Sequence, residues 1–292
     1  MIVLFGGSGR VGSAAIHALL AQRDMSRDSP HLRLMTRRPN EVDFGRHVEI
    51  IEGDLDNARS VLHALDGATQ LFIASAPHPE MDIREIRLMR AAAERGIRSV
   101  VKISGSDGLV GPRSRSLTMR QHHAAEEELR SSGLQWAILR PSAFIQTFME
   151  QIAPFVRDRR RFGLPGGEHG FSFIDVRDIG EVAAAMLSGD SHWNQIHVLT
   201  GPEELRYDEI AADLSRALGS RVSYRSQSLF FARIAINQQV HYHYARDQAA
   251  DLAAMVRSDI SDHPTDTVSR ILGRPPRSVH AWIEEHRDLF MR

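Results

Sequence analysis

Residues Ile2–Gly12, IVLFGGSGRVG, carry the clearest indication of how this chain folds. Its first four residues, Ile2–Phe5, form an apolar run that leads without a break into a turn rich in glycine. A continuous apolar run is typical of a strand buried on both faces of a sheet. After the turn, apolar residues recur at helical spacing between Val11 and Leu20. We therefore expect the chain to open with a strand, a tight turn and a helix.

The same alternation continues through the first half of the chain. Further strands are predicted at residues 32–35, 48–51, 71–74, 100–103 and 136–139, and helices at 61–65, 83–93 and 119–129. An alternation of this kind predicts a parallel sheet whose crossover helices cover both faces. We therefore expect an α/β protein built on a Rossmann-type, doubly wound parallel sheet.

The pattern changes after residue 140. We expect a helix at 143–156, a loop at 159–170, a short strand at 171–175, a helix at 179–187 and a strand at 196–199. Later helices are predicted at 207–218, 229–236, 245–256, 265–272 and 279–286, with a brief strand at 222–224. We therefore divide the chain into a dinucleotide-binding domain, 1–142 and 171–200, and a smaller, mainly helical substrate-binding region, 143–170 and 201–292.

Composition excludes several classes of protein. With 292 residues, of which 42% are hydrophobic and 25% charged, the chain can form a sizeable core and is not disordered. A net charge of −1 gives no electrostatic footprint for nucleic acid or an anionic membrane. Cysteine is absent, which excludes disulfides and thiolate chemistry. No apolar run is long enough to span a membrane, and we expect a cytoplasmic protein with neither nucleic acid nor membrane as a partner.

The glycines of the first turn follow the pattern G-x-x-G-x-x-G between a strand and a helix. Residues without a Cβ let backbone amides approach a pyrophosphate closely, and the helix N-terminus adds partial positive charge. No Gly-Lys-Ser/Thr follows, which excludes the other common phosphate-binding loop. The motif predicts that a dinucleotide is bound by Gly6, Ser8, Gly9, Arg10, Val11 and Gly12.

The residues at the end of the second predicted strand bear on the choice of cofactor. NAD sites usually carry Asp or Glu there for the ribose hydroxyls, whereas Arg binds the 2′-phosphate of NADP. This chain has Thr36, Arg37 and Arg38, and no acid. Because an Arg side chain can hold a phosphate through paired N–H donors, the sequence predicts NADP(H) in preference to NAD(H). The alternative is a pair of solvated surface arginines.

These motifs resemble the NmrA-like, atypical branch of the short-chain dehydrogenase/reductase family, and within it the NAD(P)H-dependent quinone oxidoreductase-like members. The resemblance covers most of the chain and rests on segments 6–12, 36–39, 53–55, 132–141, 174–179, 199–202 and 272–276. It implies further cofactor contacts: Asp54 and Leu55 with the adenine, Ala74, Ser75 and Ala76 with the ribose, and Pro141 with the nicotinamide. For Asp54 the alternative is a turn residue or a cap before a helix.

The resemblance also implies residues that contact the substrate. Ser104 would polarise it, and Pro77 and Phe144 would lie against it. The alternative for Ser104 is a hydroxyl that closes the end of a strand, and for Phe144 it is a core aromatic side chain.

One pattern of the family is missing. Orthodox members carry Tyr-x-x-x-Lys, in which the lysine lowers the pKa of a tyrosine that delivers a proton to a carbonyl. Counted back from Ser132, the corresponding positions fall near Thr118 and His122, and the only lysine of the chain is Lys102. His122 could donate a proton, because an unperturbed imidazole has a pKa near ~6.5. The alternative is a polar histidine on a helix face that also exposes Glu126; for Lys102 we expect a scaffold role beside an acidic partner.

The missing pair favours an acceptor that needs no strong acid. Hydride addition to a quinone gives a phenolate whose conjugate acid has a pKa of ~10, against ~16 for an ordinary alkoxide, a difference worth about 8 kcal/mol. We therefore expect an NADPH-dependent reductase of a quinone or conjugated carbonyl, with its small-molecule substrate bound between the carboxyl edge of the sheet and the helical region.

Other functions stay open. A non-catalytic NADP(H)-sensing regulator with a protein partner is the main alternative, and a reductase or epimerase of a specialised metabolite is a weaker one. The 15 histidines show no metal-ligand spacing, so we expect no metal. The chain is expected to be a monomer or a homodimer.

Overall fold

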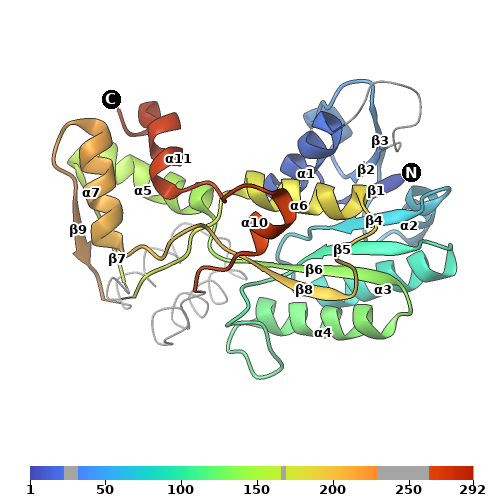
Figure 1. Ribbon diagram of the computed structural model, residues 1–292. Coiled ribbons are helices and arrows are strands. Elements are labelled where there is room, and N and C mark those ends of the chain that lie inside the picture. The colour runs from blue at the N-terminus through green and yellow to red at the C-terminus, as the bar shows by residue number, and fades with distance from the viewer. Residues whose placement is uncertain (23–31, 166–168, 229–262, 292) are drawn as a thin grey trace. The chain divides into compact units, whose positions relative to one another are not determined.

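The computed structural model describes residues 1–22, 32–165, 169–228 and 263–291 (Figure 1). Its main feature is a seven-stranded sheet in the order β3-β2-β1-β4-β5-β6-β8. The strands are β1 (Ile2–Phe5), β2 (Leu32–Thr36), β3 (Val48–Glu52), β4 (Gln70–Ile73), β5 (Ser99–Ile103), β6 (Gln135–Pro141) and β8 (Gln195–Leu199). The paired strands from β3 to β6 are parallel, as the sequence predicts.

Helices cover both faces of this sheet. They are α1 (Arg10–Ala21), α2 (Ala58–Leu65), α3 (Met81–Glu94), α4 (Leu117–Ser131) and α6 (Val176–Ser188), with the short 3-10 helix η1 (Pro39–Glu41). In Figure 1, α1 and α6 lie on one face and α3 and α4 on the other. The core on the second face is formed by alternate strand residues such as Val3, Phe5 and Val100, against Leu88 of α3 and Leu129 of α4. The Rossmann-type, doubly wound arrangement is confirmed.

The chain groups into two compact units. One contains residues Met1–Ser104, Gln121–Arg140 and Val176–His197, and the other Gly105–Arg120, Pro141–Asp175 and Val198–Arg292. The first unit holds the glycine turn and most of the sheet. The domain boundaries given above stay a prediction.

The second unit contains α5 (Ile145–Arg159), β7 (Arg161–Leu164), α7 (Tyr207–Leu218), β9 (Ser223–Ser226), α10 (Thr267–Leu272), α11 (Val279–Glu285) and the 3-10 helix η2 (Arg287–Phe290). Its core gathers aromatic side chains, and in it the rings of Phe148 and Tyr207 stack 5.3 Å apart. The smaller, helix-rich C-terminal region is therefore found.

Two local predictions in this unit are wrong. The predicted loop at 159–170 contains β7, which pairs in parallel with β9, because Arg160 turns the chain at a φ of 50° and Phe162 is then buried against Tyr224. The predicted strand at 171–175 is reduced to two isolated bridges, Phe144 with Ile174 and Phe171 with Leu205. The helices predicted at 229–236 and 245–256 lie outside the described residues.

None of the helices in the described part of the chain has the length and apolar character that crossing a bilayer requires.

Candidate functional site

The turn between β1 and α1 has room for glycine and for nothing larger at two positions. Gly6 has a φ of +78°, and a Cβ on it would lie 1.9 Å from the carbonyl oxygen of Ala74. A Cβ on Gly12 would lie 2.3 Å from the carbonyl oxygen of Gly6. Both neighbours are backbone atoms, which cannot rotate away as a side chain can. The glycines therefore hold the turn closely against the end of β4 and the first turn of α1.

The same turn leaves backbone amides for a ligand. Gly9 is the N-cap of α1 and provides no side-chain cap, and the Ser13 N–H donates to the Gly9 carbonyl at 2.8 Å. The amides that precede Ser13 in the first turn have no intrahelical acceptor, and they lie at the positive end of the helix. Ser8, Gly9 and Arg10 are exposed. This is the arrangement that binds the phosphates of a dinucleotide.

The predicted determinants of NADP binding lie at the end of β2, the strand next to β1. Thr36 is buried, and its Oγ1 accepts a hydrogen bond from the Arg38 N–H at 3.3 Å. Arg37 and Arg38 are both exposed. The Arg38 guanidinium pairs with Glu41 at 3.1 Å, whereas Arg37 makes no ion pair with any other described residue. Arg37 is thus the arginine whose charge is not already matched.

Asp54 follows β3 and shapes the turn before α2. Its Oδ1 accepts from the Asp56 N–H at 3.0 Å, while the cap of α2 is Asn57, which accepts from the amides of Arg59 and Ser60. Of the two structural alternatives for Asp54, the turn residue is therefore found and the cap is not. The adenine contacts of Asp54 and the half-buried Leu55 stay predictions.

The segment after β4 contributes an unpaired polar group. The Ala74 N–H donates to the Phe5 carbonyl at 2.9 Å, which ties the end of β4 to the end of β1. The Ser75 Oγ is buried and has no hydrogen-bond partner among the described residues. Ala76 and Pro77 beyond it are exposed. Because β1, β2 and β4 are parallel neighbours, these segments share the carboxyl edge of the sheet, and the orphaned hydroxyl fits a polar ligand there.

Six polar side chains form a second feature, the buried polar cluster: Glu85 of α3, Lys102 of β5, Ser104 after β5, His122 and Glu126 of α4, and Arg140 of β6. Lys102 alternates with Val100, so it points to the face of the sheet that α3 and α4 cover. Its Nζ lies 2.7 Å from Glu85 Oε2, and both side chains are 0% exposed. The expected pairing of Lys102 with an acid is confirmed.

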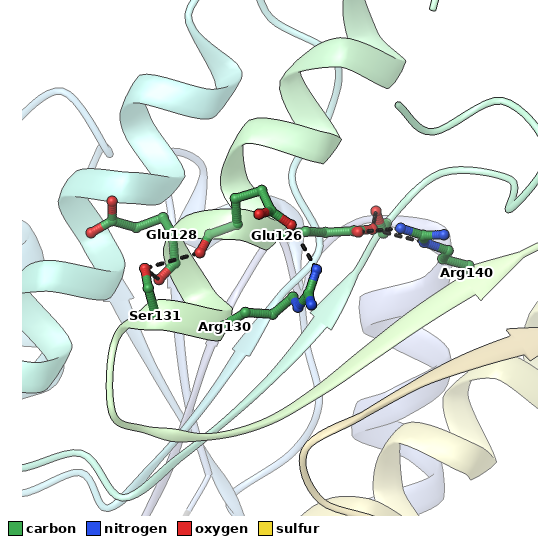
Figure 2. Close-up of polar contacts among 7 residues, drawn as sticks. Glu126, Glu128, Arg130, Ser131 and Arg140 are labelled. Carbon is green, nitrogen blue, oxygen red and sulfur yellow. Dashed lines mark hydrogen bonds and ion pairs between the residues drawn. The ribbon is translucent and has the colours of Figure 1, made fainter. Parts of the chain in front are cut away.

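The other half of the buried polar cluster is centred on Glu126. Ser104 Oγ donates to Glu126 Oε1 at 2.5 Å, and Arg140 Nε donates to the same oxygen at 3.0 Å. Arg140 also pairs with Glu126 Oε2, and Figure 2 shows the two residues joined in this way. The expectation that Glu126 is exposed is wrong. It is 1% exposed, because it lies on the same helix face as His122, four residues earlier, and this face is turned inward.

His122 is 8% exposed, and its Nδ1 lies 3.2 Å from Lys102 Nζ. Burial, reinforced by the positive charges of Lys102 and Arg140, lowers the pKa of the imidazole well below 6.5. The ring is therefore neutral at neutral pH, in contrast to the unperturbed imidazole on which its expected role as a proton donor rests.

This lowered pKa predicts that the protein loses stability as the pH falls below 6.5. Histidine in the unfolded chain takes up a proton there while the buried imidazole does not, so the unfolded state binds more protons and is favoured by up to about 1.4 kcal/mol per pH unit. A His122→Gln variant lacks this contribution. Between about pH 7 and about pH 5, its free energy of unfolding should fall less steeply than that of the wild type. Equal slopes would contradict the prediction; the exposed His280→Gln serves as the control variant.

Other predicted residues lie in the second unit and are not brought together with the turn by anything described. Thr118 is buried at the start of α4, and Pro141 is buried at the end of β6. Phe144 is half-buried and precedes α5, where its bridge to Ile174 fixes the backbone. Their roles stay predictions. Within the described ranges, no group of three or more His, Asp or Glu side chains could hold a metal ion.

The sequence reasoning missed Glu85 and Arg140. A signal for Glu85 exists: it lies four residues from Met81 and from Met89, both buried, so it occupies the apolar stripe of α3. An acid in such a stripe indicates a buried partner of opposite charge. For Arg140 the signal is weaker: by alternation it lies on the same face of β6 as Ile138, but the sequence does not show that an acid meets it there.

Comparison with known proteins agrees with this geometry. The family model described as NAD(P)H-binding matches residues 6–189. The chain is 29% identical over 294 residues to an NAD(P)H azoreductase of Xenophilus azovorans, covering 99% of each. It is 28% identical over 291 residues to (4-alkanoyl-5-oxo-2,5-dihydrofuran-3-yl)methyl phosphate reductase of Streptomyces griseus, again covering 99% of each.

Among solved structures, an NADPH-dependent quinone oxidoreductase of Escherichia coli in complex with NADPH matches with a TM-score of 0.86 and 20% identity, covering 99% of this chain and 100% of that one. At 20% identity, this likeness shows that the two chains share a fold and nothing more. The family model spans more than half of the chain and begins at the first glycine of the turn, so sequence and fold agree. The chain belongs to the NAD(P)H-binding family that this model describes.

Proposed function

We propose that this protein is an NADPH-dependent reductase that acts on a conjugated acceptor, namely a quinone or a conjugated carbonyl. The observation that carries the proposal is the buried, neutral His122, near the place where we expect the lysine of the orthodox tyrosine–lysine pair. All four tyrosines of the chain follow residue 206, and the only lysine is held by Glu85. The site thus offers a hydrogen-bond donor rather than a strong acid.

The acceptor must match such a site. An ordinary ketone becomes a strongly basic alkoxide, which needs a proton as it forms, whereas a conjugated acceptor becomes a delocalised and weakly basic anion. The names of the relatives support this class: an azo compound, a 5-oxo-2,5-dihydrofuran and a quinone all have conjugated double bonds. Hydride addition to any of them gives a delocalised anion that a hydrogen bond can stabilise.

The chain's own residues hold the reactants. When bound, NADPH supplies the hydride, and the protein supplies binding and orientation. The first-turn amides of α1 bind the pyrophosphate, and the Ser75 hydroxyl has an unfilled hydrogen bond at the same edge of the sheet. His122 holds its proton at a ring nitrogen and donates a hydrogen bond to the developing anion.

A panel of matched acceptors tests the proposal. We expect the purified chain to consume NADPH with a naphthoquinone, an azo dye and an enone, and not with the saturated ketone that matches the enone. Tight binding of NADP⁺ without turnover of any acceptor would overturn the proposal in favour of the non-catalytic NADP(H)-sensing regulator. Turnover of the saturated ketone at a similar rate would contradict the argument from His122.

We further propose that NADPH is preferred to NADH. Replacing Arg37 and Arg38 together by alanine should weaken NADPH binding by about 10- to 100-fold, because hydrogen bonds to a charged phosphate contribute about 1.5–3 kcal/mol. NADH binding should stay within about twofold, and calorimetric titration of both coenzymes measures the two effects. Arg130→Ala, at an exposed arginine of α4, is the matched control. Equal losses for the two coenzymes would show that these arginines do not contact the 2′-phosphate.

A further inference from the structure

The ammonium group of Lys102 is buried among groups of this chain. It has three N–H donors and no acceptor. Three acceptors lie around it: Glu85 Oε2 at 2.7 Å, the Ile103 carbonyl at 3.2 Å and His122 Nδ1 at 3.2 Å. Because the side chain is 0% exposed, its N–H donors cannot reach a substrate or a cofactor. Lys102 can therefore act only through the groups that it contacts.

One of these contacts determines the state of His122. Because Lys102 can only donate, the Nδ1 of His122 must accept, and a neutral imidazole then carries its single proton on Nε2. The lowered pKa of the imidazole agrees with a neutral ring. No described residue accepts a hydrogen bond from Nε2, and 8% of the residue remains exposed. The Nε2–H is thus a donor in the buried polar cluster that no described residue accepts.

Ser104 is the other candidate for polarising a substrate, but its hydroxyl proton is donated to Glu126. Its Oγ donates to Glu126 Oε1 at 2.5 Å. Arg140 contacts both oxygens of that carboxylate, so Glu126 accepts and has no proton to return. The Ser104 oxygen is left with lone pairs only, and it can accept a hydrogen bond but not give one while this contact lasts.

Stability alone does not explain the Lys102–Glu85 pair. Both side chains are 0% exposed, and neither carboxylate oxygen of Glu85 makes a hydrogen bond within the described residues, so Lys102 contacts Glu85 as an ion pair only. Apolar residues of similar volume often replace a buried ion pair without loss of stability. A positive charge held against one nitrogen of a histidine has a specific chemical consequence that apolar residues cannot reproduce.

We propose that Lys102 is a positioning residue: anchored by Glu85, it holds His122 as the tautomer protonated on Nε2 and so presents this N–H to the atom of the acceptor that gains negative charge. The proposal rests on the proposed function for the nature of the acceptor. The tautomer itself does not depend on it.

Nuclear magnetic resonance of the full chain labelled with ¹⁵N and ¹³C in histidine tests the tautomer without any substrate. The ring signals of His122, assigned by their loss in His122→Gln, should report the proton on Nε2 near neutral pH. In the double variant Lys102→Met with Glu85→Leu, which removes both charges of the pair, we expect a mixture of the two tautomers. A wild-type ring protonated on Nδ1, or a tautomer that does not change in the double variant, would overturn the proposal.

Activity gives a second readout. In the double variant, kcat should fall by about 10- to 100-fold, on the scale of a weakened transition-state hydrogen bond, while KM and the Kd of NADPH change by less than about threefold. His122→Gln, whose amide can donate from the place of Nε2, should keep more of kcat than His122→Asn, whose amide reaches only the place of Nδ1. Equal kcat in these two variants, with both folded, would overturn the donor role. If no acceptor is turned over at all, the proposed function fails, and the resonance experiment still decides the tautomer.

Discussion

A Gly12→Ala variant should lose NADPH affinity by about 100-fold or more. The new Cβ would lie 2.3 Å from the Gly6 carbonyl oxygen and 2.4 Å from the Gly7 Cα, and neither backbone atom can move without opening the turn. Opening the turn displaces the first-turn amides of α1, and each charge-assisted hydrogen bond that is lost costs about 1.5–3 kcal/mol. Two such bonds account for the expected factor. Calorimetric titration with NADPH measures it, and the melting temperature reports any accompanying loss of stability.

A glycine outside the turn provides the control for this prediction. Gly180 of α6 packs against α1, and a Cβ on it would lie 2.5 Å from the Ala14 carbonyl carbon. Gly180→Ala should therefore lower the melting temperature without weakening NADPH binding to a comparable degree. If both variants lose the same affinity, the loss comes from general destabilisation of α1, and the role assigned to the turn is wrong.

A Lys102→Met variant should lose about 3–5 kcal/mol of unfolding free energy, the usual effect of removing one partner of a buried ion pair. The Glu85 carboxylate would be left fully buried, with no charge opposite it. Chemical denaturation monitored by circular dichroism measures the change. The size of the effect comes from the uncompensated charge and not from the loss of packing, because methionine fills a similar volume.

Two further variants separate these causes. Adding Glu85→Leu to Lys102→Met removes the second charge and should restore most of the lost stability. Arg95→Met breaks an ion pair with Asp66 in which both side chains are well exposed, and it should cost less than about 1 kcal/mol. A Lys102→Met variant no less stable than Arg95→Met would show that the buried Glu85 carboxylate does not depend on Lys102 as its counter-charge.

Much of the dinucleotide site could be predicted from the sequence because it is local. The turn from Gly6 to Gly12, its strand and its helix are contiguous, and the requirement for glycine follows from backbone sterics. Arg37 and Arg38 could be placed at the same edge because every strand of a parallel sheet ends there. The strand paired with β9 was missed for the opposite reason: Phe162 gains a β partner only when Tyr224, far along the chain, lies beside it.

Three features follow from the order of the residues alone: the succession of strands and helices, the dinucleotide-binding turn and the lack of a tyrosine–lysine pair. Which charges meet depends instead on the packing: Lys102 pairs with Glu85 and contacts His122, and Glu126 turns inward to Arg140 and Ser104. A charge can be buried only beside a partner, and the packing of α3 and α4 on β5 and β6 chooses that partner from residues distant in the chain. The apolar stripe of α3 indicates that Glu85 is buried, whereas the packing of α3 against β5 shows that its partner is Lys102.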